Sequence, residues 1–336
     1  MKIFPTQNYS IFKKNQKTQI SPLKYNNQPQ RDTVSFSSKS LITNSFGDNI
    51  KQATLFGKQI YGKLSRGAQQ DELARLIQQN YPNVNVKPME ELSIEDKDLY
   101  FAFYTHQINP DFTPKTPELY IDFKGSNNPT ANMISACEVA HEYTHLIQSY
   151  TPKAIREYEA ISKGDVEYLE VVSGLGDSIF KYYDTTEQAN MIKGVFTMQD
   201  VANLQMHGKL VPRKYDITKN SLISKSPYEN EKEFRSSVNS AFDYCFDVIS
   251  NELLHLPENQ VLPRLKEKYR EILLSGKLDE LRKDVKKYIE ISARNEKEAY
   301  ATECQVAKST LNTTDSLNID SFALYYQMLE NALKLG

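Results

Sequence analysis

The chain has no tryptophan, only three cysteines and only five histidines among its 336 residues. The cysteines, Cys137, Cys245 and Cys304, are odd in number and widely separated, which predicts neither a disulfide framework nor a cysteine metal site. Residues 1–8 include a lysine but no continuous apolar stretch after it, unlike a Sec signal peptide. We therefore expect a reducing, cytoplasmic setting, and the alternative is export by a route without a Sec signal peptide.

The sequence also lacks an excess of either charge and any long hydrophobic run. The formal net charge is −2, which gives no reason to expect nucleic acid or an anionic membrane as a partner. No apolar stretch approaches the length of a membrane span. Residues 1–50 are rich in Asn, Gln, Ser and Thr without sustained periodicity, and this composition predicts a disordered tail.

An H-E-x-x-H motif occupies residues 141–145. His141 and His145 are four residues apart, so in a helix both imidazoles project from one face. Such a pair binds Zn²⁺, and Glu142 lies within reach of a water on the metal. Glu142 is therefore the predicted general base, which takes the proton of that water and passes it to the leaving amine. The alternative is a helix with two surface or capping histidines.

The helix that carries the motif is expected to be buried on most of its circumference. Its apolar positions form two stripes at helical spacing. The first stripe is Cys137, Ala140, Thr144 and Ile147, and the second is Val139, Tyr143 and Leu146. Histidines and carboxylates on the remaining arc need partners because burial of unpaired polar groups is costly, and a metal ion supplies one.

The segment V-A-H-E-Y-T-H-L-I-Q, preceded by a helix and strands, resembles the catalytic core of the zincin metallopeptidases over roughly residues 66–150. Threonine before the second histidine is similar to the gluzincin branch, which includes the thermolysin-like enzymes. The resemblance implies zinc-dependent hydrolysis of a peptide or protein substrate. The metzincin pattern is not met, because Gln148 and Thr151 stand at its two later positions. The third ligand implied by the resemblance is therefore a carboxylate.

Two regions of the chain compete for this third ligand. Residues 158–170 lie at about the distance that thermolysin-like enzymes use. Residues 294–303 contain Glu298 followed by Ala299, which resembles the third-ligand helix of gluzincin-like families with long insertions. We expect His141, His145 and Glu298 to bind the zinc. A role for Glu298 without a metal is a capping box with Asn295. The other candidates are Glu159, Glu167, Glu170, Glu296 and Glu303.

The remaining histidines, His106, His207 and His255, show no ligand spacing, so we expect structural or surface roles for them. His207 or a tyrosine is a candidate to help the metal polarise a substrate carbonyl.

The pattern of elements predicts an α+β, zincin-like fold. Residues 73–81 have helical spacing, and strands are expected at 83–86, 99–104 and 118–123. Further helices are expected at 166–183, 234–256, 261–274, 278–291 and 319–335. Residues 51–336 would form the catalytic domain, with the sheet and active helix in 51–150, a helical part in 151–336 that supplies the third ligand, and a cleft between them. The alternative function is a zincin-like fold that no longer cleaves and serves as a binding module.

Overall fold

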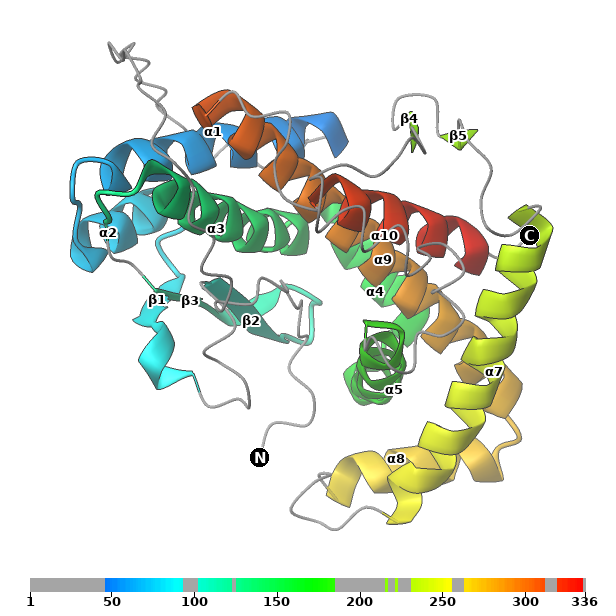
Figure 1. Ribbon diagram of the computed structural model, residues 1–336. Helices are drawn as coiled ribbons and strands as arrows, with labels where there is room; N and C mark the ends of the chain where they lie inside the picture. The colour runs from blue at the N-terminus through cyan, green and yellow to red at the C-terminus, as the bar shows by residue number, and fades with distance from the viewer. Residues whose placement is uncertain are drawn as a thin grey trace.

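A computed structural model describes residues 46–92, 102–122, 125–184, 215–216, 221–222, 231–255, 263–311 and 319–334. It has α+β architecture, with mostly helical content and a small three-stranded sheet (Figure 1). In chain order the elements are α1 (Phe46–Leu64), α2 (Gln70–Asn80), β1 (Asn85–Pro88), the 3-10 turn η2 (Met89–Glu91), β2 (Ala102–Ile108), β3 (Pro114–Ile121), α3 (Pro129–Ser149), α4 (Pro152–Ser162), α5 (Val166–Asp184), β4 (Tyr215–Asp216), β5 (Ser221–Leu222), α7 (Glu231–His255), α8 (Pro263–Leu274), α9 (Leu278–Leu311) and α10 (Ile319–Leu333).

The sheet has the strand order β1-β3-β2, with β1 parallel and β2 antiparallel to the central strand β3. Strand β2 is therefore an edge strand, and it lies beside α3. Tyr104 of β2 pairs with Leu119 of β3, and the register shifts between Thr105 and Gln107. One face of the sheet packs toward α3, while Phe103 and Tyr120 join a small cluster with the η2 segment on the other face.

Helix α3 begins where the sequence supplies a cap. The side chain of Asn128 accepts hydrogen bonds from the backbone N–H groups of Thr130 and Ala131, and Pro129 occupies the first helical position, where its missing N–H costs nothing. The helix is buried from Ala136 to Gln148 without a break, as its two apolar stripes predict. It lies between α1, the sheet and α9 (Figure 1).

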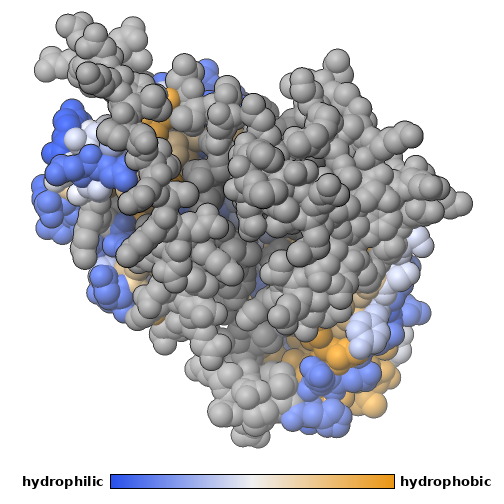
Figure 2. Space-filling view, viewed as in Figure 1, coloured by the Kyte–Doolittle hydropathy of each residue, from blue (hydrophilic) through white to orange (hydrophobic). Residues whose placement is uncertain are grey.

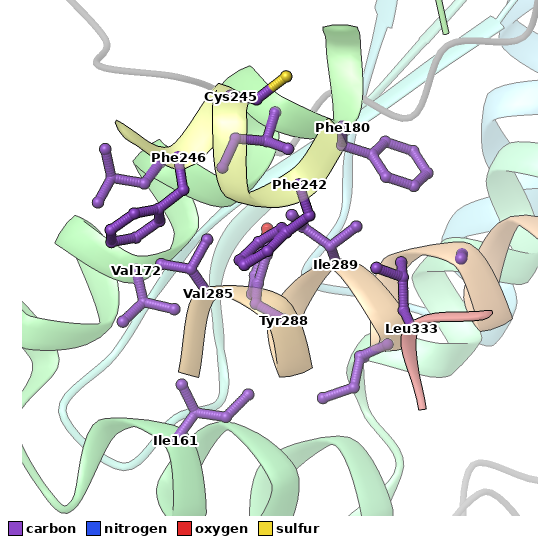
Figure 3. Close-up of a cluster of buried hydrophobic side chains, with 14 of the residues drawn as sticks. Ile161, Val172, Phe180, Phe242, Cys245, Phe246, Val285, Tyr288, Ile289 and Leu333 are labelled. Carbon is purple, nitrogen blue, oxygen red and sulfur yellow. The ribbon is translucent and has the colours of Figure 1, made fainter. Parts of the chain in front are cut away.

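Two hydrophobic cores share the long helix α9. One core surrounds α3 and contains α1, α2 and the sheet. The other contains α5, α7, α8 and α10, and Figure 3 shows Phe242 of α7, Val172 of α5 and Val285 of α9 gathered within it. Side chains of α9 from Leu281 to Cys304 contribute to the helical core, and those from Val306 to Leu311 contribute to the core around α3. Glu296 and Glu303 of α9 face α3, where they lie beside His141.

A glycine permits the close crossing of α1 with α3 and α9. A Cβ atom at Gly57 would lie 2.5 Å from Cγ2 of Val306 and 2.9 Å from Cβ of Ala140. Both distances are too short for real contacts, so only glycine allows α1 to approach at this point. This crossing holds α9 against the helix that carries the two histidines.

The structure confirms the predicted small sheet with a mostly helical remainder, and it differs from the predicted elements most clearly at α9, α4 and α1. Helix α9 continues through Asn295, so the predicted end near residue 291 and the capping role of Asn295 are wrong. Ser292 and Asn295 have low helix propensity, but the burial of Ile291, Ala293 and Glu296 shows that tertiary packing outweighs it. Helix α4 was not expected. Helix α1 begins at Phe46, within the predicted tail, and residues 1–45 lie outside the described residues.

Some hydrophobic surface lies over α7 and α8, interspersed with hydrophilic side chains (Figure 2). The large exposed hydrophobic side chains there are Tyr244 and Val248 on α7 and Leu274 at the end of α8. Among the described residues, no helix combines the length and the apolar character needed to cross a membrane.

Candidate metal centre

Among the described residues, His141, His145 and Glu296 form a group that can hold a metal ion. One ligand atom from each residue lies within 4.8 Å of the others. The two histidines come from α3 and the glutamate from α9, where these helices pack together. All three side chains are buried, with His141 and Glu296 fully so. A buried group of two imidazoles and one carboxylate is a common set of metal ligands.

The distances within this group suit a bound ion. Nε2 of His141 lies 3.2 Å from Oε2 of Glu296, and Nε2 of His145 lies 3.5 Å from Oε1 of Glu296. Each of these two distances, which involve different oxygens of Glu296, is close to the separation of about 3.3 Å between ligands bound at 2.0–2.1 Å to a tetrahedral metal. None of these four atoms has a hydrogen-bond partner among the described residues. Buried polar atoms without partners are rare and costly, so their convergence fits a metal ion that satisfies them together.

Each histidine is held by a second group at its other ring nitrogen. Nδ1 of His141 lies 2.5 Å from Oε1 of Glu303, and Nδ1 of His145 lies 2.9 Å from Oε1 of Gln148. Such outer partners orient metal-binding imidazoles and fix which nitrogen carries the hydrogen. Both Nε2 atoms then remain available to a ligand.

The two imidazoles differ in their electrostatic surroundings. Burial lowers the pKa of His145 to about 4, so this imidazole is neutral, as a metal ligand must be. Burial also disfavours protonated His141, but the carboxylates of Glu296 and Glu303 on either side outweigh it and raise the His141 pKa well above its usual range. The same negative surroundings that favour a proton on His141 favour a metal cation in its place.

Glu142 is fixed by the edge strand of the sheet. Its Oε2 accepts a hydrogen bond from the backbone N–H of Tyr104 at 2.9 Å, and its Oε1 is buried without a hydrogen-bond partner among the described residues. Burial raises the Glu142 pKa well above its usual range, and the Tyr104 hydrogen bond opposes that shift. A carboxyl group with a raised pKa and one free oxygen is suited to taking up a proton near neutral pH.

The expected third ligand, Glu298, lies outside this group. Its Oε2 accepts a hydrogen bond from Nε2 of Gln148 at 2.8 Å. Two earlier candidates are exposed, Glu159 on α4 and Glu167 on α5. Glu170 on α5 forms an ion pair with Arg264. The structure therefore brings Glu296, which we had ranked behind Glu298, to the two histidines.

Helical spacing shows which residues share a face of α9 with Glu296. Glu296 and Glu303 are seven residues apart, which places both on one face of a continuous helix, and Tyr300 lies between them on that face. Tyr300 packs edge-on against His141, with ring centroids 4.6 Å apart.

The remaining histidines lie outside the metal group or outside the described residues. His106 is on β2, where its ring stacks on Tyr104 with centroids 5.2 Å apart, and burial lowers its pKa to about 4. His255 is the exposed last residue of α7. His207, the candidate for polarising a substrate carbonyl, lies outside the described residues.

Comparisons of the chain with protein-family models, curated proteins and solved structures find no match.

Proposed function

We propose that this chain is a zinc-dependent metallopeptidase with a zincin-like catalytic core. The observation that carries the proposal is the convergence of unpartnered ligand atoms from His141, His145 and Glu296 beside the buried carboxylate of Glu142. Two imidazoles and one carboxylate favour zinc, and three protein ligands leave a position open for a reacting molecule. The resemblance of the motif to the zincins supports peptide hydrolysis as the reaction.

A bound Zn²⁺ ion supplies Lewis acidity, which polarises a peptide carbonyl and acidifies water. His141 and His145 would hold the ion as neutral imidazoles, and Glu303 and Gln148 orient their rings. Glu296 supplies the negative charge that partly balances the cation.

Glu142 moves the proton. Its Oε2 is held by the N–H of Tyr104, so its Oε1 is the oxygen that takes a proton from the attacking water. The same carboxyl group then donates this proton to the leaving amine. Because Tyr104 lies on edge strand β2, the sheet fixes the position of the base relative to the histidines of α3.

The test combines metal content with peptide cleavage. The purified chain should contain about one zinc ion per molecule, and a diverse peptide mixture should show new termini by mass spectrometry that disappear with a chelator. Glu142→Gln should retain the zinc and lose cleavage by about 10²- to 10⁴-fold, since it keeps the shape of the side chain but cannot act as a base.

The control is Glu290→Gln, which removes another buried carboxylate, on α9, that pairs with Lys287. This variant should keep both zinc and cleavage. Zinc binding without cleavage of any peptide, in wild type and Glu142→Gln alike, would instead indicate a zincin-like binding module. A wild-type chain that binds no divalent metal would overturn the proposal.

A further inference from the structure

Gln148 connects His145 to helix α9 through both ends of its side-chain amide. Its Oε1 lies 2.9 Å from Nδ1 of His145. Its Nε2 donates to the backbone carbonyl of Asn295 at 3.1 Å and to Oε2 of Glu298 at 2.8 Å. Gln148 and Glu298 are both buried. The amide is therefore held at three points.

The two contacts on α9 determine which way this amide faces. A backbone carbonyl oxygen and a carboxylate oxygen accept hydrogen bonds, and only the NH₂ end of an amide can donate to them. The Asn295 carbonyl and Glu298 use both hydrogens of that NH₂ group. A reversed amide would place its oxygen against two acceptors, so α9 keeps the oxygen of Gln148 toward His145.

This orientation determines which nitrogen of His145 carries the hydrogen. Because Oε1 of Gln148 can only accept, Nδ1 of His145 must be the donor, and the lone pair of the neutral ring is then on Nε2. Nε2 is the atom that lies 3.5 Å from Glu296. A metal ion needs that lone pair.

We infer that Glu298 is a positioning residue that, through Gln148, keeps His145 in the tautomer that presents Nε2 to the metal. The inference deepens the proposed function and rests on it. It accounts for a buried carboxylate two residues from a ligand that does not itself join the ligand group. A carboxyl oxygen accepts from Gln148 whether or not the group is ionised, so the role does not depend on the charge of Glu298.

The inference predicts a pattern of Zn²⁺ affinities, measured on the full chain by competition with a chromophoric chelator. Glu298→Leu keeps a side chain of similar size but removes the acceptor, so affinity should fall about 10- to 100-fold, the range for outer-shell partners. Gln148→Leu should fall by a similar factor. The double variant should be no weaker than Gln148→Leu alone, because the two residues act through one chain of contacts.

Exchanging the two groups tests the same chain of contacts by rescue. Gln148→Glu alone sets two carboxylates against each other and should weaken Zn²⁺ binding. Combined with Glu298→Gln, it provides an acceptor for His145 and an amide donor behind that acceptor, so affinity should return toward wild type. The matched control is Glu290→Leu, also on α9 and, at 6 %, as little exposed as Glu298. It removes a bonded carboxylate, which pairs with Lys287, and should leave affinity unchanged.

The tautomer itself is measured without any metal. In ¹⁵N NMR of the metal-free protein, the His145 ring should carry its hydrogen on Nδ1 in wild type and lose that preference in Glu298→Leu. A wild-type ring protonated only at Nε2, or an unchanged tautomer in Glu298→Leu, would overturn the inference even if the chain bound no metal and the proposed function failed separately.

The affinities give two further ways to reject it. If Glu298→Leu binds Zn²⁺ like wild type while Gln148→Leu does not, Glu298 has no positioning role. If Glu298→Leu loses Zn²⁺ as completely as Glu296→Ala does, and its effect adds to that of Gln148→Leu, then Glu298 is a direct ligand.

Discussion

Helix α9 carries charged side chains of two kinds within one turn, and two of them are partly buried while Glu296 is fully buried. Arg294 donates two hydrogen bonds to Glu157, at 2.8 and 2.6 Å, and Lys297 bonds Glu330 at 2.6 Å. Glu296 stands between these paired residues, and neither of its oxygens has a hydrogen-bond partner among the described residues. The same helix therefore pairs its charges with opposite charges where it meets α4 and α10, whereas where it meets α3 it places Glu296 against two imidazoles without a hydrogen bond among the described residues.

This difference in pairing separates charges that stabilise the fold from a charge that is available to bind a ligand. In the Lys297–Glu330 ion pair each charge has its opposite charge within the protein, and their attraction offsets the free-energy cost of removing them from water. Glu296 faces two imidazole nitrogens that also have no hydrogen-bond partner, so a cation would complete all three residues at once. Predictions that change one kind of charge and not the other test this distinction.

The largest expected effect is on metal affinity. Glu296→Ala removes one of three ligands, so Zn²⁺ affinity should fall by orders of magnitude, well beyond the 10- to 100-fold typical of outer-shell partners. Glu330→Ala removes an equally buried carboxylate that lies against α9 from α10, and its Zn²⁺ affinity should not change. Chelator competition on both variants measures this difference. Equal affinities for the two variants would refute the distinction.

The next largest effect is on the free energy of unfolding, and here a change at Glu330 is the one that has the effect. Glu330→Leu removes the carboxylate that pairs with the partly buried Lys297, and this should lower the free energy of unfolding by about 3–5 kcal/mol. Replacing both partners, with Lys297→Met added, should recover most of the loss because no unpaired charge remains. Denaturant unfolding of the metal-free protein measures both. A double variant as unstable as the single one would show that the ion pair is not the cause.

The sequence was sufficient for the parts of the site that depend on local spacing. His141, His145 and Glu142 follow from one motif in one helix, and the buried helix follows from its two apolar stripes. The third ligand depends on how α9 rotates against α3, which no local pattern records. The choice between Glu296 and Glu298 needs the rotation of α9 about its own axis relative to α3. The resemblance carried by Glu298 and Ala299 favours Glu298, whereas the packing of α9 on α3 brings Glu296 to the two histidines.

The fold likewise has features that depend on local sequence and features that depend on contacts between distant segments. The amphipathic helices α2, α5 and α8 and the cap at Asn128 are local features, and they were predicted or are readable from the sequence. The parallel pairing of β1 with β3 and the close approach at Gly57 depend on contacts between distant segments. These contacts follow from packing, so the sequence pattern alone did not predict them.

A smaller effect on affinity is expected behind the other histidine. Glu303→Gln replaces the carboxylate at Nδ1 of His141 with a neutral amide that can still accept a hydrogen bond. Zn²⁺ affinity should fall about 10- to 100-fold. Because Glu303 helps to raise the His141 pKa, the variant should also bind Zn²⁺ with less competition from protons at low pH. Affinities measured across a pH series test both. A pH dependence identical to that of wild type would show that Glu303 does not control His141.

The smallest expected effect is on the pH dependence of stability, and it concerns a buried carboxyl group that has no hydrogen bond to a histidine among the described residues. Asp177 on α5 accepts a hydrogen bond from the hydroxyl of Tyr288 at 2.9 Å through one oxygen, and its other oxygen has no hydrogen-bond partner among the described residues. Burial raises the Asp177 pKa well above its usual range, although the Tyr288 hydrogen bond opposes this.

The carboxyl group of Asp177 in the folded protein therefore keeps a proton that the same group in the unfolded chain loses near pH 4. As the pH rises from about 4 through the folded pKa, this difference lowers the free energy of unfolding. Asp177→Asn removes this titration, so its free energy of unfolding relative to wild type should increase as the pH rises over that interval. Unfolding experiments on the metal-free protein from about pH 4 to about pH 8 measure this difference. Tyr288→Phe removes the bond that favours the ionised form, so it should extend the loss to higher pH. A constant difference between Asp177→Asn and wild type at every pH would show that Asp177 is ionised in the folded protein, with a partner for its charge like Glu330 on α10.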